Sequence, residues 1–142
     1  MSERGFVNEP DMKAIVRLKL YSGGQEVFMN VEIDTGAGLE LVVPSSAAGI
    51  IGIELGDNRT AQLADGSMIV TREGLAELDW LGEKRIVIGV IFYEAGDFAP
   101  LDARRHAGRA HGRLGRNLLR DAKLTIDYPN RSVTVEPLFG RN

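Results

Sequence analysis

The sequence of 142 residues contains no cysteine. This absence excludes disulfide bonds, a thiol nucleophile and zinc sites with cysteine ligands. There is also no excess of one charge: 17 basic and 20 acidic side chains give a formal net charge of −3, which does not favour a nucleic-acid or anionic-membrane partner. No apolar run is long enough to span a bilayer, and the charged N-terminus lacks the apolar core of a signal peptide. We therefore expect a cytoplasmic protein with no membrane partner.

The length and the apolar content of 44% fit one compact domain with its own core. We place this domain at residues 14–137. Residues 1–13 are interpreted as an N-terminal extension that need not be ordered, and residues 138–142 as a C-terminal tail.

Alternation of polar and apolar residues predicts a mostly β-structure. The dipeptides Asp65-Gly66 and Pro129-Asn130 are typical hairpin turns between such alternating segments. The apolar run 84–93 is nearly continuous, which predicts a strand buried on both faces. The expected strands cover residues 14–21, 26–33, 39–43, the two arms of 60–74, 74–82, 84–93 and the two arms of 123–137.

Two short helices are expected beside these strands. Ser45 or Ser46 is a suitable N-cap for one or two helical turns after Pro44. Leu114, Leu118 and Leu119 have helical spacing, which predicts a helix over residues 114–122. The fold class predicted is an all-β, barrel-like domain with one short C-terminal helix.

Asp34 ends the second expected strand, and Gly36 and Gly38 prevent regular continuation of that strand. A loop of this composition is common as a simple strand-terminating turn, because Asp and Gly favour local hydrogen bonds there. A phosphate-binding glycine loop is excluded, since position 41 is Leu instead of the third glycine and Pro44 stops any long helix.

The sequence Ile33-Asp34-Thr35-Gly36-Ala37 resembles the active-site loop of the aspartic proteases, in particular the single-domain retropepsin-like group of clan AA. Further similarities follow in family order: residues 41–55 resemble the segment after that loop, 63–74 the flap hairpin, and 114–128 the Gly-Arg-Asn stretch that opens the C-terminal helix. The resemblance implies a retropepsin-like closed β-barrel with a flap hairpin and one short C-terminal helix. Two positions depart from the family pattern, which has apolar residues in place of Glu32 and Arg113.

The resemblance further implies a homodimeric aspartic endopeptidase that hydrolyses extended peptide or unfolded protein and uses neither cofactor nor metal. Two Asp34 carboxyls, one from each chain, would activate the attacking water. The alternative is a retropepsin-like dimer that only binds peptide or protein. The residues implied as catalytic are Asp34, Thr35 and Gly36, and those implied as substrate-binding are Ala37, Asp65, Gly66, Ser67 and Met68.

Strand alternation puts Glu32 on the same side as Asp34. Its carboxylate would either act on the paired aspartates or point to solvent. We expect the solvent position, because an unpaired buried charge is costly.

Residues 102–113 lack apolar periodicity and predict a solvated loop. A metal site formed by Asp102, His106 and His111 is an alternative, but five-residue spacing between the histidines suits neither a helical pair nor a tight metal loop. Nucleic-acid contact would lack interleaved aromatic residues for base stacking, so no nucleic-acid partner is expected. A sharper hypothesis is that the basic side chains favour acidic residues flanking the scissile bond. These side chains are Arg104, Arg105, Arg109 and Arg113.

Overall fold

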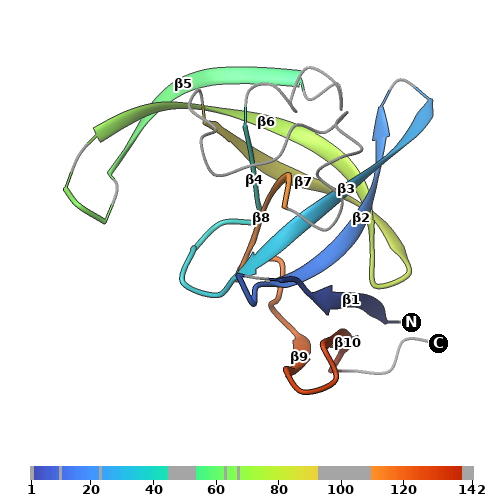
Figure 1. The fold of residues 1–142 in the computed structure, drawn as a ribbon. Coiled ribbons are helices and arrows are strands. Elements are labelled where there is room, and N and C mark those ends of the chain that lie inside the picture. The colour runs from blue at the N-terminus through green and yellow to red at the C-terminus, as the bar shows by residue number, and fades with distance from the viewer. Residues whose placement is uncertain are drawn as a thin grey trace.

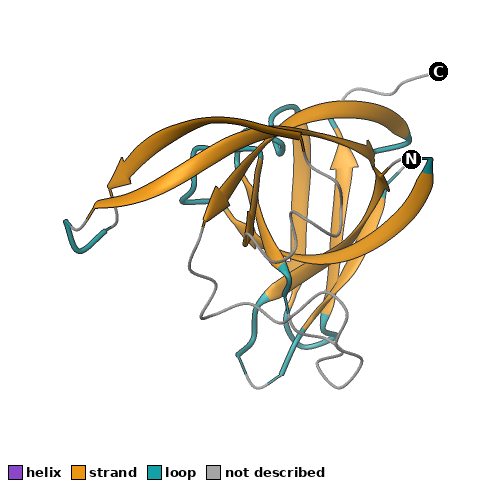
Figure 2. Cartoon of the chain, turned by 90° about the horizontal axis from the view of Figure 1, so that it is seen from above, coloured by secondary structure: helices purple, strands orange, loops and turns teal. Residues whose placement is uncertain are grey.

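The computed structural model describes residues 2–9, 11–22, 24–44, 54–62, 64–66, 68–92 and 110–138. Within these ranges the protein has ten strands and no helix, which confirms the all-β part of the predicted fold class (Figures 1 and 2). In chain order the strands are β1 Glu3–Val7, β2 Ala14–Ser22, β3 Gln25–Asp34, β4 Leu41–Pro44, β5 Glu54–Gln62, β6 Met68–Trp80, β7 Glu83–Phe92, β8 Gly112–Gly115, β9 Ala122–Asp127 and β10 Ser132–Pro137.

These strands form one strongly curled sheet in the order β5-β6-β7-β4-β8-β3-β2-β1-β10-β9. The curl brings β6 back to β2, where Leu78 lies opposite Leu20 in an additional antiparallel pairing. Figure 2 shows how the strands wrap around a common interior. The curl follows from the right-handed twist of strands, which accumulates across a sheet of this size.

The predicted hairpins are present. Strands β2 and β3 pair from Ser22 opposite Gln25 back to Ile15 opposite Glu32. Strands β5 and β6 pair on either side of a turn in which Gly66 has φ of +88°, a conformation that glycine adopts without strain. In both views this hairpin reaches away from the other strands (Figures 1 and 2). Strands β9 and β10 flank the turn at Pro129-Asn130.

Three features of the sheet differ from the sequence-based expectations. Residues 74–82 do not start a separate strand, because β6 runs without a break from Met68 to Trp80. Residues 3–7, expected within an extension, form β1, which pairs with both β2 and β10. Strand β7 is not buried on both faces at its start, since Ile86 is 68% exposed while Val87 is buried.

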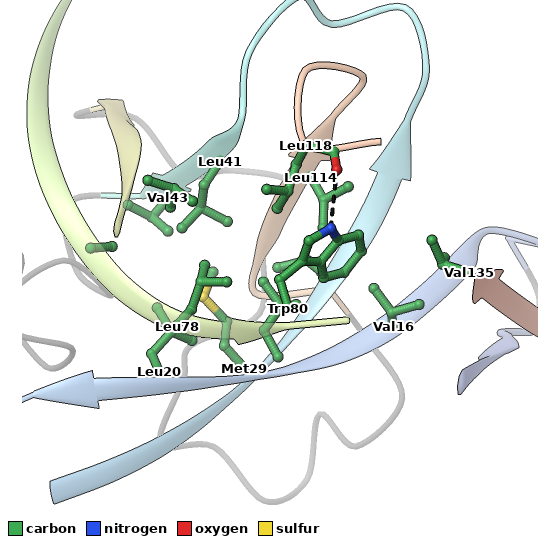
Figure 3. Close-up of a cluster of buried hydrophobic side chains, with 14 of the residues drawn as sticks. Val16, Leu20, Met29, Leu41, Val43, Leu78, Trp80, Leu114, Leu118 and Val135 are labelled. Carbon is green, nitrogen blue, oxygen red and sulfur yellow. Dashed lines mark hydrogen bonds between the residues drawn. The ribbon is translucent and has the colours of Figure 1, made fainter. Parts of the chain in front are cut away.

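The prediction of a C-terminal helix over residues 114–122 is wrong. Leu114 and Gly115 belong to β8, and residues 116–121 form turns. The N–H groups of Leu118 and Leu119 donate three residues back, to Gly115 O and Arg116 O. The carbonyl of Leu118, which would accept from residue 122 in an α-helix, accepts instead from Trp80 Nε1 at 3.1 Å (Figure 3). The leucine spacing therefore buries Leu114 and Leu118, and partly buries Leu119, without a helix. The short helix expected after Pro44 lies outside the described residues.

The core lies inside the curl and is built from alternate residues of several strands (Figure 3). Each fully buried side chain of this kind stabilises the fold by roughly 1.5–3 kcal/mol relative to exposure. Trp80 is the largest, and its indole joins β6 to the turn after β8. The labelled members are Val16, Leu20, Met29, Leu41, Val43, Leu78, Trp80, Leu114, Leu118 and Val135.

Candidate active site

Asp34 is the last residue of β3, beside the glycine that ends β8. The two strands pair in parallel, with Val31 opposite Gly112 and Asp34 opposite Gly115. Strand β8 also pairs antiparallel with β4, so it lies between the strands that precede and follow the Asp34 loop. The loop after β3 must therefore cross over the end of β8.

The Asp34 side chain takes part in a local turn. Its Oδ1 accepts a hydrogen bond from the N–H of Gly36 at 3.1 Å, and its backbone carbonyl accepts from the N–H of Ala37 at 3.2 Å. An aspartate that hydrogen-bonds a backbone N–H two residues later is a recurrent turn geometry. The turn interpretation thus holds locally, and it fixes the orientation of the carboxylate.

The loop backbone is held by the three residues that follow Leu114. Five consecutive loop carbonyls, from Gly36 to Glu40, each accept a hydrogen bond from Gly115, Arg116 or Asn117. The donors, in the order of the acceptors from Gly36 to Glu40, are Arg116 Nη1 at 3.0 Å, Arg116 N at 2.9 Å, Asn117 Nδ2 at 3.0 Å, Asn117 N at 3.1 Å and Gly115 N at 3.0 Å. A loop with every successive carbonyl paired is rigid, which is what a positioned catalytic side chain requires.

This close contact requires glycine at position 115. A Cβ there would lie 2.1 Å from Leu39 O and 2.9 Å from Ala37 O, both backbone atoms that cannot rotate away. The crossing of loop and strand thus depends on a residue with no side chain.

Sequence reasoning assigned no role to Arg116 and Asn117 beyond the family resemblance. The sequence feature that could have indicated their role is the presence of two polar residues directly after Gly115, inside a segment of regularly spaced leucines. Both side chains are exposed and reach back to the loop, where Arg116 also lies 2.9 Å from the position that a Gly38 Cβ would occupy.

The other residues expected at the catalytic loop lie on an accessible surface. Thr35 and Gly36 are exposed, and Asp34 and Ala37 are partly buried. A Cβ on Gly36 would meet only Asp34 Oδ1, at an ordinary 3.4 Å. The protomer itself therefore does not require glycine at position 36, in contrast to position 115.

The expected flap residues lie at the tip of the β5–β6 hairpin. Asp65 and Gly66 form its exposed turn, and Met68, the first residue of β6, is 58% exposed. Ser67 lies outside the described residues. An exposed apolar side chain at a hairpin tip is suited to contact a ligand or another chain.

Glu32 does not point to open solvent, which corrects the expectation for this residue. It lies opposite Arg113 in the β3–β8 pairing, and its Oε2 is 3.7 Å from Arg113 Nε and 3.4 Å from Lys13 Nζ. Its side chain is 18% exposed. The two positions that depart from the family pattern are therefore partners in one ion pair, which removes the cost expected for an unpaired charge.

In the segment 102–113, the structure describes residues 110–113, of which Ala110 is buried. His111 forms two contacts with Asn30: its N–H donates to Asn30 O at 2.8 Å, and its Nδ1 accepts from Asn30 N at 3.0 Å. Positions 112 and 113 belong to β8, so the solvated loop does not extend through Arg113 as expected. The positions Asp102, His106, Arg104, Arg105 and Arg109 lie outside the described residues.

Two cavities are lined by described residues. One, of about 470 Å³, lies beside Glu40, Trp80 and Asn117. The other, of about 560 Å³, lies along Arg17, Phe28 and His111. Asp34 does not line either of these two cavities.

No family model matches the chain, and no curated protein is similar to it in sequence. Over the described residues, no helix has the length and apolar character needed to cross a membrane.

Proposed function

We propose that the protein is a homodimeric aspartic peptidase of the retropepsin-like type, which hydrolyses peptide bonds in extended peptides or unfolded proteins. One observation carries the proposal: Asp34 lies beside the exposed residues Thr35 and Gly36, on a loop whose five carbonyls from Gly36 to Glu40 are all held by Gly115, Arg116 and Asn117. A simple surface turn does not need such support, whereas a catalytic carboxylate does.

The strand pairings support a closed barrel. Since β6 pairs with β7 and with β2, and β4, β8 and β3 link β7 to β2, six strands follow one another in a ring. The position of β8 between β3 and β4 supports the same assignment, because it brings the Gly115 segment under the Asp34 loop. The β5–β6 hairpin is the proposed flap.

The chemistry requires two carboxyl groups at one water molecule. One must be ionised to take a proton from the water, and one protonated to polarise the peptide carbonyl. A chain with one Asp34 supplies half of this pair, so the site forms where two chains meet and place the two carboxyls side by side. Like charges about 3 Å apart cannot both ionise, so the pair holds one proton and activity peaks on the acidic side of neutrality.

The exposure of Thr35 and Gly36 supports this arrangement. In the proposed dimer the Thr35 side chains hydrogen-bond across the two-fold axis, and Gly36 allows the two backbones to approach closely. Ala37 leaves room for the substrate backbone. The hairpin tip with Asp65, Gly66, Ser67 and Met68 closes over the substrate and supplies strand-like hydrogen bonds.

The decisive experiment is a pH-resolved digest of a peptide library by wild type and by Asp34→Asn. Wild type should cleave at mildly acidic pH and Asp34→Asn should not, because the amide keeps the shape of the side chain but cannot exchange the proton. Asp127→Asn is the matched control, since Asp127 also ends a strand and its Oδ1 accepts from the N–H of Asn130 at 3.2 Å. Cleavage of the same peptides by Asp34→Asn at a comparable rate would exclude a catalytic Asp34.

The same digest tests whether the site is shared. Specific activity should fall on dilution below the dimer dissociation constant, as mass action requires. Activity that stays proportional to protein where sedimentation detects only monomer would exclude a shared site. A wild type that dimerises and binds peptide without cleaving it would support the binding-only dimer.

A further inference from the structure

A charged cluster lies on the same face of the sheet as Asp34. In β3, Val31 and Ile33 face the core, so the alternate residues Glu32 and Asp34 face the opposite side. Glu32 and Asp34 are about 6.6 Å apart along the strand, the rise of two residues. Arg113 occupies the position opposite Glu32 in β8. A ligand that reaches Asp34 over this face therefore approaches charged side chains.

The cluster has an excess of positive charge. The Glu32 carboxylate is contacted by two cations, Lys13 and Arg113, so the three side chains carry a net charge of about +1 at neutral pH. The Arg113 and Lys13 side chains remain 35% and 39% exposed. A second carboxylate can thus reach this cluster from solvent.

We propose that Arg113, balanced by Glu32, selects substrates with an acidic side chain one or two residues from the scissile bond. The inference rests on the proposed function, because Asp34 marks where the peptide is cleaved. An extended peptide advances about 3.3 Å per residue, so a side chain one or two positions from that bond reaches the level of Glu32 and Arg113. The planar guanidinium fork of Arg113 matches the geometry of a carboxylate, and its side chain is 35% exposed.

Glu32 limits the strength of this selection. Its carboxylate competes with the substrate carboxylate for the same cations, so the preference should be moderate in wild type and stronger without Glu32. Ion pairs between partly exposed groups change equilibria by factors up to about five, which sets the expected selectivity. Because the groups are accessible to ions, the selectivity should decrease at high salt.

The test starts from a peptide that wild type cleaves, prepared with Asp or Asn at each position within two residues of the scissile bond. Assays at about pH 5.5 keep the peptide Asp ionised. Wild type should cleave the Asp peptide up to about fivefold faster in kcat/KM than the Asn peptide at low salt. Arg113→Leu should reduce the ratio to about one, mainly by slowing the Asp peptide, and Glu32→Gln should raise the ratio above that of wild type.

Arg17→Leu is the matched control. Arg17 lies on the same outer face, but it is opposite Asn30, which is four residues from Asp34 along β3. Its Cζ lies 4.2 Å from the centre of the Phe28 ring. Its loss should leave the Asp-to-Asn ratio unchanged. An equal effect of Arg17→Leu and Arg113→Leu, or equal rates for the two peptides in wild type, would overturn the inference.

The outcome is separable from that of the proposed function. Asp34-dependent cleavage without an acid preference would leave the peptidase assignment intact and refute only the role of Arg113. If wild type cleaves no peptide, fluorescence anisotropy of a labelled library peptide that it binds, prepared in Asp and Asn forms, decides: a lower Kd for the Asp form, lost in Arg113→Leu, supports the selection, and equal Kd values overturn it. If Arg113→Leu does not fold, the increase expected for Glu32→Gln decides, because a purely structural ion pair would not sharpen selectivity when broken.

Discussion

Two glycines beside Asp34 should respond in opposite ways to the addition of one methyl group. Neither Gly36 nor Gly115 has a positive φ, so alanine is compatible with the backbone at both positions. Their surroundings differ: the nearest atom to a Cβ is 3.4 Å away at Gly36 and 2.1 Å away at Gly115. We predict that Gly115→Ala destabilises the protomer, whereas Gly36→Ala spares the protomer and impairs the proposed dimer and its proposed peptidase activity.

The magnitudes follow from these distances. At Gly115 the overlapping atoms are backbone, so relief requires moving the loop, at an overpacking cost of about 1–3 kcal/mol. Losing one or two of the hydrogen bonds that hold the loop adds about 1 kcal/mol each, for a total of about 2–5 kcal/mol. At Gly36 the free energy of unfolding of the monomer should change by about 0.5 kcal/mol or less. In the proposed dimer, the same methyl group would separate the two backbones at their expected crossing.

Three measurements on each variant test this prediction. Urea unfolding at a concentration where the protein is monomeric gives protomer stability, sedimentation gives the dimer dissociation constant, and peptide cleavage gives activity. Gly36→Ala with wild-type dimerisation and activity would show that position 36 is not at the dimer crossing. Gly115→Ala with wild-type stability would contradict the register that places Gly115 beside Asp34 and under the loop.

The other stability predictions concern hydrogen bonds outside the loop, one made by Trp80 and two that join Asn130 to Asp127. Trp80→Phe should lower the free energy of unfolding by about 2 kcal/mol, because it leaves the buried Leu118 carbonyl without its donor; a urea-unfolding change below about 0.5 kcal/mol would contradict this. Hydrogen bonds from Asn130, mainly from its side chain and less from its backbone N–H, hold the pKa of Asp127 below its ordinary value of 3.8. The stability that the ionised Asp127 contributes is therefore present above pH 3.8 and is lost as pH falls through the lowered pKa. Asn130→Ala should therefore lower Tm near pH 6 and have a diminishing effect below pH 3.8, and a Tm difference that stays constant down to about pH 2.5 would refute the linkage.

Much of the fold was predictable because its signals are local. Period-two alternation in β2 and β3, and glycine at the left-handed position of the Asp65-Gly66 turn, act over a few residues and are retained in the structure. The predictions that were wrong depend on distant contacts. Leucine spacing after Gly115 is compatible with a helix, but Trp80, 38 residues away in sequence, takes the carbonyl that a helix would use.

For the candidate site, the sequence identified the Asp34 loop but not the residues whose hydrogen bonds hold that loop in place. The hydrogen bonds from Arg116 and Asn117 to loop carbonyls span about eighty residues in sequence, so no local pattern reveals them. The same holds for Glu32. Considered alone, its charge next to Asp34 predicted a solvent position, whereas the parallel register of β3 and β8 pairs it with Arg113.

The sequence by itself determined the all-β class, the hairpin turns and the position of Asp34 at the end of a strand, because backbone preference and side-chain alternation act between neighbours. Only the tertiary structure decided that β8 inserts between β3 and β4, that Gly115 lies where no side chain fits, and that Glu32 and Arg113 share one ion pair. These features arise from pairing of segments far apart in the chain, and register between such segments is set by the packing of the whole sheet rather than by either segment alone.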